Sequence, residues 1–399
     1  MDLNFPFPLD AAQPVPFTIS VNESFVRQTV RKAADYRPSA DLLDGSNANW
    51  LEGPPRANMT ALGSYWAEEY DWAAEQDRIN GELSHFAVVV PETEAWPHPV
   101  PLHYVHERAE NDDDDDDSLP LLLLHGWPST KGHDVVAVDL PGFGFSPAPQ
   151  HAGFDPKTIA AVLDAFMTQL GYARYGVVST DLGWWVGMWM TDVVPSSSSP
   201  NSNRLAGHFS DFFLVPPNAT DLERYAANLT TPEETRMITS NQAWYNGHTG
   251  YQHVQTMQPL AVGQAFSDSP VGFAGWVWHI LFSVSDQHPY TFDDIITTAF
   301  VLFVQGTWGN LRYYKELFNA EAMNFPKTDV PTGVSQWGMG DATSPFPELA
   351  DFNMIPRDWL ERQSNIKQVY RHDAGGHFPA INLPLEWAAD VLDFFAKHV

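Results

Sequence analysis

The chain has 399 residues and no cysteine, so it can bury a large core without disulfide bonds and offers neither a thiol nucleophile nor a cysteine-ligated metal site. Its 21 lysines and arginines against 50 aspartates and glutamates give a formal net charge of −29, which disfavours binding to nucleic acids and anionic membranes. The longest aliphatic run, 121–124, is too short to span a membrane, and the N-terminus lacks the basic and apolar regions of a signal peptide. We therefore expect a cytoplasmic protein without a membrane anchor or a nucleic-acid partner.

The first part of the chain, residues 1–85, is aromatic and polar, with helical spacing over 24–34 and 59–79. The second of these helices carries aromatic residues that we expect to pack against another part of the protein: Tyr65, Trp66, Tyr70 and Trp72. We interpret this part as an N-terminal helical extension.

Short apolar runs alternate with turns and helices over residues 86–216, as is typical of an α/β domain, and the pattern returns over 326–399. Residues 217–325, between these two parts, are helical and rich in aromatic residues. The predicted core elements are strands at 85–90, 121–124, 135–138, 175–178, 330–334 and 366–370 and helices over 156–170 and 383–395. The sequence thus predicts an α/β core with a mostly parallel sheet, split by a helical cap. Two low-complexity runs are interpreted as a solvated turn and a flexible loop, at 112–117 and 196–199.

A strand, a tight turn and a helix are predicted around Asp181, in the stretch Val-Val-Ser-Thr-Asp-Leu-Gly-Trp that ends at Trp184. This is the pattern of a nucleophile elbow, which requires small residues two positions either side of the nucleophile, here Ser179 and Gly183. Ser179 itself does not fit, because its own neighbours at these positions are Val177 and Asp181. An aspartate at a strand end is also a common helix N-cap, so the other motifs decide between the two roles.

The strand at 121–124 is followed by a His-Gly-Trp-Pro turn at 125–128. In hydrolases with this turn, one backbone N–H stabilises an oxyanion and the amide after the nucleophile supplies the second donor. The candidate amides are therefore those of Trp127 and Leu182.

A general base is predicted at His377, because Gly375 and Gly376 suit a tight loop after a strand. The order of nucleophile before histidine is also that of α/β-hydrolases. His372 lies nearby but lacks the preceding glycines.

Together these motifs resemble the epoxide hydrolases of the microsomal type, including soluble fungal members, from Phe17 to the C-terminus. The N-terminal extension shares the family's Trp and Asn pair, here Trp72 and Asn80. The resemblance implies an α/β-hydrolase fold, with Asp181 as the nucleophile and His377 as the base. It also implies that the reactants are a small-molecule epoxide and water, and that the reaction uses neither a cofactor nor a metal. A role in detoxification is implied as well, and a homodimer is possible.

The resemblance also places an acid just before a Pro-x-x-Trp element, here residues 356–359. Counting back from this element gives Asp351, at the distance from His377 that the fungal relatives have. Counting forward from the Val-Pro-Thr-Gly strand gives Asp341, because a short insertion separates the two anchors, and Glu348 is a third candidate. The downstream anchor is closer to the histidine, so Asp351 is preferred.

Two cap tyrosines hydrogen-bond the epoxide oxygen in the family. By the same resemblance they are Tyr251, which lies before a Gln-Pro pair, and Tyr314, with its neighbour Tyr313 as the alternative. The implied reaction opens the epoxide with the aspartate and then hydrolyses the resulting ester to a vicinal diol.

Two other functions stay open. Haloalkane dehalogenases share the fold, the aspartate and the histidine, but commonly have Trp after the nucleophile, where this chain has Leu182. A non-catalytic binding protein is the second, because only a few residues separate Pro128 from the next strand at Val135, where relatives have a helix. A parallel crossover usually needs a dozen or more residues, so we expect either an altered pairing of these strands or a missing segment.

Overall fold

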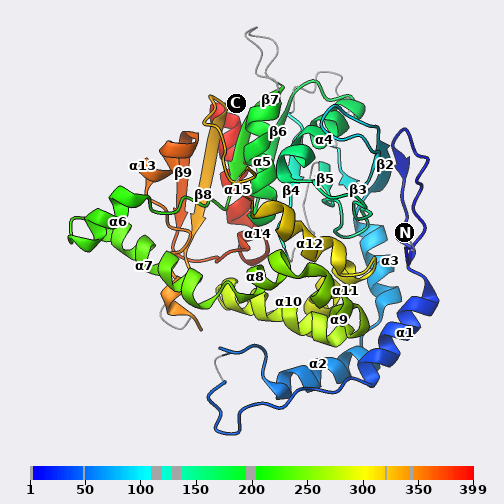
Figure 1. The fold of residues 1–399 in the computed structure, drawn as a ribbon. Helices are drawn as coiled ribbons and strands as arrows, with labels where there is room; N and C mark the ends of the chain where they lie inside the picture. Colours follow the sequence, from blue (N-terminus) through cyan, green and yellow to red (C-terminus); the bar gives the residue numbers. More distant parts are fainter. Residues whose placement is uncertain are drawn as a thin grey trace.

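The computed structural model describes residues 3–47, 50–108, 119–127, 136–194, 204–319, 321–340 and 345–399. Several features of the sequence lie outside the described residues: the runs at 112–117 and 196–199, the connection at 128–135, and Asp341. The described residues form a central sheet with helices on both faces and a helical cap below it (Figure 1).

Within the described residues the sheet has nine strands in the order β1-β2-β3-β5-β4-β6-β7-β8-β9. The strands from β5 to β9 pair in parallel, whereas β1, β2 and β3 pair in antiparallel fashion and join the sheet through β5. The strand bounds are β1 Val15–Pro16, β2 His85–Val90, β3 Val100–His106, β4 Leu121–Leu124, β5 Val136–Val138, β6 Tyr175–Ser179, β7 Leu205–Ser210, β8 Pro331–Trp337 and β9 Asn365–His372. The predicted α/β fold with a mostly parallel sheet is confirmed.

Strands β4 and β5 are the two joined by the short connection. They lie side by side in parallel, with Leu122 opposite Val136 and Leu124 opposite Val138. Residues 125–135 alone connect them, fewer than a crossover usually has. The short connection therefore leaves the parallel pairing unaltered, and β4 keeps β6 as its other neighbour.

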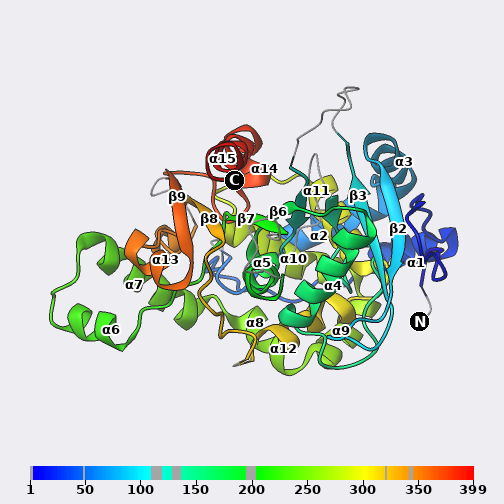
Figure 2. The same cartoon turned by 90° about the horizontal axis from the view of Figure 1, so that it is seen from above.

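Helices cover both faces of the sheet, as seen from above in Figure 2. Helices α4 and α5 lie on one face and α15 on the other, where Phe394 packs with Val178 and Phe209 of the sheet. Their bounds, with those of the short helices near the C-terminus, are α4 Pro156–Gln169, α5 Asp181–Val193, η1 Pro347–Leu349, α13 Arg357–Gln363, α14 Pro379–Asn382 and α15 Pro384–His398.

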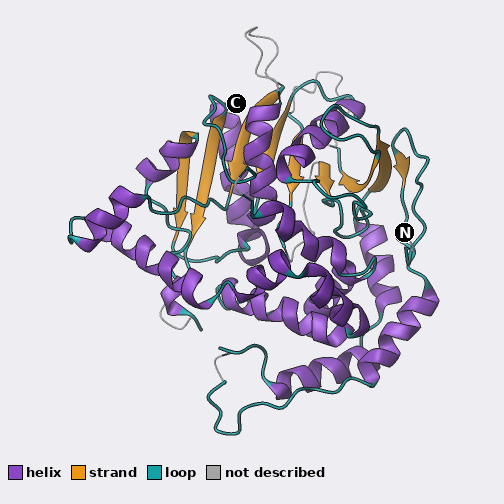
Figure 3. Ribbon diagram, viewed as in Figure 1, coloured by secondary structure: helices purple, strands orange, loops and turns teal. Residues whose placement is uncertain are grey.

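The cap is formed by helices α6 to α12, between β7 and β8, and lies at the carboxyl ends of the parallel strands (Figure 3). The bounds of its helices are α6 Ala219–Ala226, α7 Pro232–Gly247, α8 Gly250–Met257, α9 Pro259–Asp268, α10 Pro270–Val284, α11 Phe292–Phe303 and α12 Trp308–Leu317. Helix α10 is apolar nearly all round because it is buried between α9, α11 and the N-terminal helices. The cap therefore closes the edge of the sheet at which side chains of parallel strands converge.

The N-terminal extension consists of α1 (Glu23–Ala34), α2 (Arg56–Glu68) and α3 (Trp72–Glu82). The prediction of one helix over 59–79 is wrong. Asp71 divides it, because its carboxylate accepts hydrogen bonds from the first backbone N–H groups of α3 and so starts a new helix there.

The aromatic residues of the extension pack against cap helix α11, as predicted. The Trp72 ring lies 4.2 Å from that of Phe300, and the Tyr70 hydroxyl lies 2.9 Å from Thr297 Oγ1. Trp66 is buried in the same core. The extension thus packs on the outer side of the cap. The domain boundaries at residues 85, 216 and 325 stay predictions.

Candidate active site

Asp181 occupies the sharp turn between β6 and α5. Its φ of 43° lies in the left-handed region, which a residue other than glycine adopts at a cost in energy. Gly183 permits the turn, because a Cβ at this position would collide with the backbone of Leu124 and His125 at the end of β4. The strained turn thus presents the carboxylate at the carboxyl edge of the sheet.

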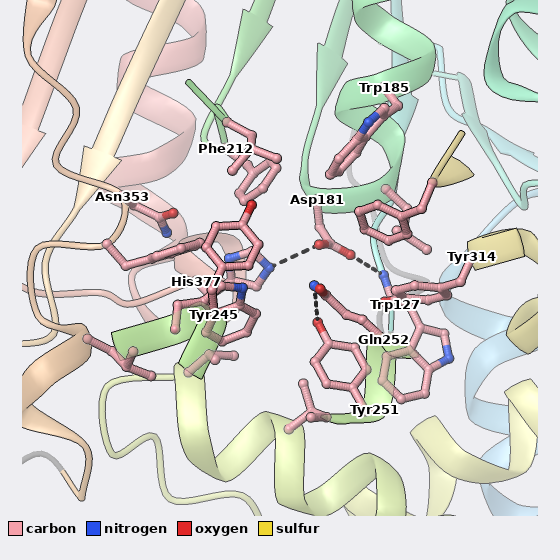
Figure 4. Close-up of a pocket in the computed structure, with 18 of the residues that line it drawn as sticks. Trp127, Asp181, Trp185, Phe212, Tyr245, Tyr251, Gln252, Tyr314, Asn353 and His377 are labelled. Atoms are coloured by element: carbon pink, nitrogen blue, oxygen red, sulfur yellow. Dashed lines mark hydrogen bonds and ion pairs between the residues drawn. The ribbon is translucent and has the colours of Figure 1, made fainter. Parts of the chain in front are cut away.

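Two groups hold the largely buried Asp181 carboxylate. The backbone N–H of Trp127 donates to Asp181 Oδ1 at 2.8 Å, and His377 Nε2 lies 3.3 Å from Asp181 Oδ2 (Figure 4). Helix α5 begins at Asp181, so the positive end of its dipole also favours the charge. One carboxylate oxygen is therefore held by a backbone donor while the other faces the imidazole. Leu182, the second expected amide, lines the same cavity.

His377 stands on a loop that the cap holds in place. Gly375 and Gly376 have φ values of 119° and 64°, which favour glycine, as the sequence predicted. The His377 backbone N–H donates to the carbonyl of Val284, at the end of α10, at 2.7 Å. The ring of Phe212, just after β7, lies edge-on to the imidazole with centroids 5.4 Å apart. The backbone bond and the ring contact together fix the imidazole beside the nucleophile turn.

The carboxylate and the imidazole face a cavity between the sheet edge and the cap (Figure 4). Most of its wall is aromatic or aliphatic, including Trp185, Leu214, Trp244, Ile280, Phe318 and Trp337. A lining of this kind with a few polar groups is suited to an apolar small molecule.

Two phenols from the cap, Tyr251 of α8 and Tyr314 of α12, line the same cavity. The Tyr251 ring stacks on Trp127 with centroids 5.8 Å apart, and the Tyr314 ring lies edge-on to Tyr251 at 5.8 Å. Burial and the nearby carboxylate raise the pKa of both phenols, so both are protonated hydrogen-bond donors at neutral pH. Tyr313, the alternative, packs instead on Phe143, with ring centroids 5.7 Å apart.

Asp351, the expected orienting acid, is not brought to His377. Its carboxylate oxygen Oδ1 lies 3.3 Å from Arg236 Nε of α7, in a partly exposed ion pair. The segment around η1 packs on α7, because Ser240 Oγ donates to the carbonyl of Glu348 at 2.6 Å, and this contact directs Asp351 toward the cap. Asp351 is therefore corrected from an expected partner of the histidine to a cap-contact residue.

Of the other two candidate acids, Glu348 is described by the structure and Asp341 is not. Glu348 Oε1 lies 3.0 Å from His248 Nε2 of the cap, and Asp341 lies outside the described residues. The segment that follows it contributes Leu349 and Phe352 to the cavity wall. The insertion seen in the sequence thus shapes the cavity rather than presenting Asp351 or Glu348 to the imidazole.

Three polar residues at this site were missed in the sequence. Gln252 and Asn353 line the cavity, and Asp211 is buried at the end of β7, where its Oδ2 accepts from Trp387 Nε1 at 2.7 Å. Burial raises the pKa of Asp211 to about 6, against the opposing effect of the His377 imidazole. The sequence offered a reason to consider two of them, because Gln252 directly follows an expected tyrosine and Asp211 directly follows a strand. No feature of the sequence points to Asn353.

Ser179 and His372, which the sequence analysis set aside, lie outside the cavity lining. Ser179 Oγ lies 2.7 Å from His208 Nε2 beneath the turn. His372 Nε2 lies 2.7 Å from Asp390 Oδ2, and its ring stacks on the indole of Trp337. Both pairs support the residues that form the cavity.

Comparison with known proteins finds similarity to epoxide hydrolases. Residues 14–132 match a family model described as epoxide hydrolase N terminus. A relative from Stigmatella aurantiaca that bears an epoxide hydrolase name is 28% identical over 415 residues, covering 96% of this chain and 84% of the relative. The chain is therefore similar to epoxide hydrolases over nearly its whole length.

Solved structures of epoxide hydrolases share the fold of this chain. The juvenile hormone epoxide hydrolase of the silkworm Bombyx mori superposes with a TM-score of 0.81 at 22% identity, covering 100% of this chain and 99% of that chain. The epoxide hydrolase of Aspergillus niger superposes with a TM-score of 0.77 at 20% identity, covering 100% of both chains. The α/β-hydrolase fold therefore extends over the whole chain. Among the described helices, none combines the length and apolar character needed to cross a membrane.

Proposed function

We propose that this protein hydrolyses an apolar epoxide to a vicinal diol through an ester formed on Asp181. The observation that carries the proposal is a carboxylate, a histidine and two phenols around one apolar cavity: Asp181, His377, Tyr251 and Tyr314. Relatives with epoxide hydrolase names support the same reaction class.

Ring opening is the first step of the proposed reaction. Asp181 Oδ1 stays on the Trp127 N–H, while Oδ2 attacks a ring carbon and the carbon–oxygen bond of the epoxide breaks. The oxygen that leaves becomes an alkoxide, which is a poor leaving group in water. Hydrogen bonds from the phenols of Tyr251 and Tyr314 stabilise that charge as it develops.

Ester hydrolysis is the second step. His377 Nε2 takes a proton from a water molecule, which attacks the carbonyl carbon of the Asp181 ester. The carbonyl oxygen becomes negative where the Trp127 N–H already donates, and the Leu182 amide is the second proposed donor. The bond between the carbonyl carbon and the alcohol oxygen then breaks, the imidazolium gives its proton to that oxygen, and the diol leaves. The Asp181 carboxyl group releases the remaining water proton, which regenerates the carboxylate. A carboxylate that orients the imidazole completes the proposal.

The class of substrate follows from the cavity wall. Its tryptophan and phenylalanine side chains favour an aryl or other bulky apolar epoxide over a small polar one. A role in detoxification would fit such a substrate. A cytoplasmic location and a homodimer stay predictions from the sequence.

Haloalkane dehalogenation is disfavoured by the hydrogen bonds of the lining tryptophans. Such enzymes bind halide through indole N–H groups, which must be free to point into the cavity. Three of the four lining indoles donate elsewhere, Trp127 to Asn310, Trp185 to Met323 and Trp337 to Ser335, which leaves Trp244 without the second indole donor that a halide site uses.

The proposal is tested by a single turnover of the purified protein with styrene oxide in ¹⁸O-water. We expect the label in the Asp181 peptide and unlabelled oxygen in the diol, because water attacks the ester carbonyl rather than the epoxide. Label delivered directly to the diol would contradict the ester mechanism. A folded protein that forms neither ester nor diol with a panel of aryl and alkyl epoxides would support the binding-protein alternative.

The carboxylate that orients His377 can be identified by three variants. Asp351→Asn is expected to leave ester hydrolysis within about twofold of the unmodified protein, because the partner of this carboxylate is Arg236. Asp341→Asn is expected to slow the same step about 100-fold or more, as loss of the orienting acid does in other triads. Asp211→Asn tests the buried carboxyl at the end of β7. Stopped-flow measurement of ester decay separates the three, and a large loss for Asp351→Asn would reinstate that residue.

A further inference from the structure

We propose that Gln252 is a positioning residue that makes Tyr251 the phenol that protonates the substrate oxygen during ring opening. The inference rests on the proposed function and deepens it, because it assigns different tasks to the two cap tyrosines. Gln252 lines the same cavity as Asp181 and follows Tyr251 in helix α8. Figure 4 shows its amide between the nucleophile and the phenol.

The first support is the direction of one hydrogen bond. Gln252 Nε2 donates to the Tyr251 phenol oxygen at 3.1 Å. Because that oxygen accepts from the amide, its own O–H remains available to donate. The Tyr251 ring is also fixed, since it stacks on Trp127 and lies edge-on to Trp244. With its ring held on two sides and its oxygen held by an amide, Tyr251 keeps its hydroxyl hydrogen available to a substrate in the cavity that it lines.

The second support is the charge that the amide favours. Burial and the Asp181 carboxylate raise the pKa of the Tyr251 phenol, whereas the Gln252 amide and the Tyr314 phenol lower it. A donor aimed at the phenol oxygen stabilises negative charge there, which is the charge that oxygen acquires as its proton passes to the substrate. The amide is therefore placed to strengthen Tyr251 as an acid.

The third support is the contrast with Tyr314. Its hydroxyl is buried, and the neighbouring Tyr251 raises its pKa further, whereas the Tyr314 phenol lowers the pKa of Tyr251. Tyr314 is thus suited to donate a hydrogen bond without giving up its proton. In this pair, Tyr251 gives its proton to the substrate with the help of Gln252, and Tyr314 donates a hydrogen bond and keeps its proton.

The step balances as follows in atoms and charge. Asp181 Oδ2 forms a bond to a ring carbon as the carbon–oxygen bond of the epoxide breaks, and the electron pair of that bond goes to oxygen. Tyr251 transfers its proton to this oxygen, leaving a phenolate that the Gln252 N–H stabilises. In the second step the His377 imidazolium gives the proton taken from water to the alcohol oxygen that leaves the ester. The other water proton, then on the Asp181 carboxyl group, passes through solvent to the phenolate, which restores the carboxylate and the phenol.

The test is a double-mutant cycle on the rate of Asp181 alkylation, measured by rapid quench with styrene oxide. Gln252→Leu keeps the size of the side chain and removes the donor, and we expect it to slow alkylation about tenfold, the scale of one hydrogen bond to a charged group. Ester hydrolysis, which does not use the phenol, is expected to be unchanged. In the Tyr251→Phe background, Gln252→Leu is expected to have no further effect, because the group it acts through is absent.

Two further variants guard the result against a folding defect. Gln252→Ala is a second removal of the donor, and His253→Leu changes the next, exposed residue of the same helix without touching the cavity lining. An equal loss from Gln252→Leu with and without the Tyr251 hydroxyl would overturn the inference, and so would an unchanged alkylation rate. If the unmodified protein forms no ester at all, the proposed function fails together with the inference. A normal ester with an insensitive Gln252 overturns the inference alone.

Discussion

Replacing Asp181 by alanine is expected to abolish diol formation, with a loss of about 10⁴-fold or more in kcat/KM. The variant removes the oxygen that attacks the substrate in the proposed reaction, and no other carboxylate lines the cavity in the described part of the chain. The Trp127 N–H and the two phenols stay in place, so substrate binding is expected to change little. A low residual rate would come from water attacking an epoxide that the phenols polarise.

The measurement is diol production by chromatography, together with the mass of the protein after incubation with styrene oxide. Asp192→Ala is the matched control, because this aspartate lies on the same helix but is exposed at its far end. We expect the control to keep full activity and the Asp181 variant to carry no covalent adduct. An adduct on the Asp181→Ala protein would show that another residue is the nucleophile.

Replacing His377 by glutamine is expected to trap the ester. In the proposed reaction the imidazole acts only after the ring is open, so alkylation of Asp181 should proceed at close to its normal rate. Hydrolysis of the ester should fall about 10³-fold to 10⁴-fold, because the lining of the cavity holds no second histidine and no carboxylate besides Asp181 among the described residues. The protein should therefore gain the mass of one substrate molecule and stop after one turnover.

Intact-protein mass spectrometry measures this adduct directly. His372→Gln is the matched control, because this histidine stands five residues earlier, pairs with Asp390 and lies outside the cavity lining. It is expected to turn over without accumulating an adduct. Steady multiple turnover by the His377→Gln protein would contradict the role of the imidazole as base.

The sequence by itself determined the features that depend on neighbouring residues. One such feature is the run of leucines that ends in the His-Gly-Trp-Pro turn. Another is the strand before Asp181 with Gly183 after it, because only a small residue fits at position 183 so close to the end of the neighbouring strand. Two glycines before His377 predicted the left-handed loop that presents the imidazole. The alternation of strands and helices predicted the parallel sheet, since period and turn chemistry are local properties.

Only the tertiary structure decided which distant side chains meet. Asp351 has a suitable spacing from His377, yet the packing of its segment on α7 directs it to Arg236, and no count along the chain contains that contact. A helix predicted over 59–79 is divided at Asp71, because capping there lets both halves pack on the cap. The hydrogen bond that distinguishes Tyr251 from its partner depends on side-chain direction, which sequence spacing does not specify. Turns, strand ends and loops depend on residues that are neighbours in the sequence. The pairing of acids, bases and hydrogen-bond donors depends instead on how separate elements pack together.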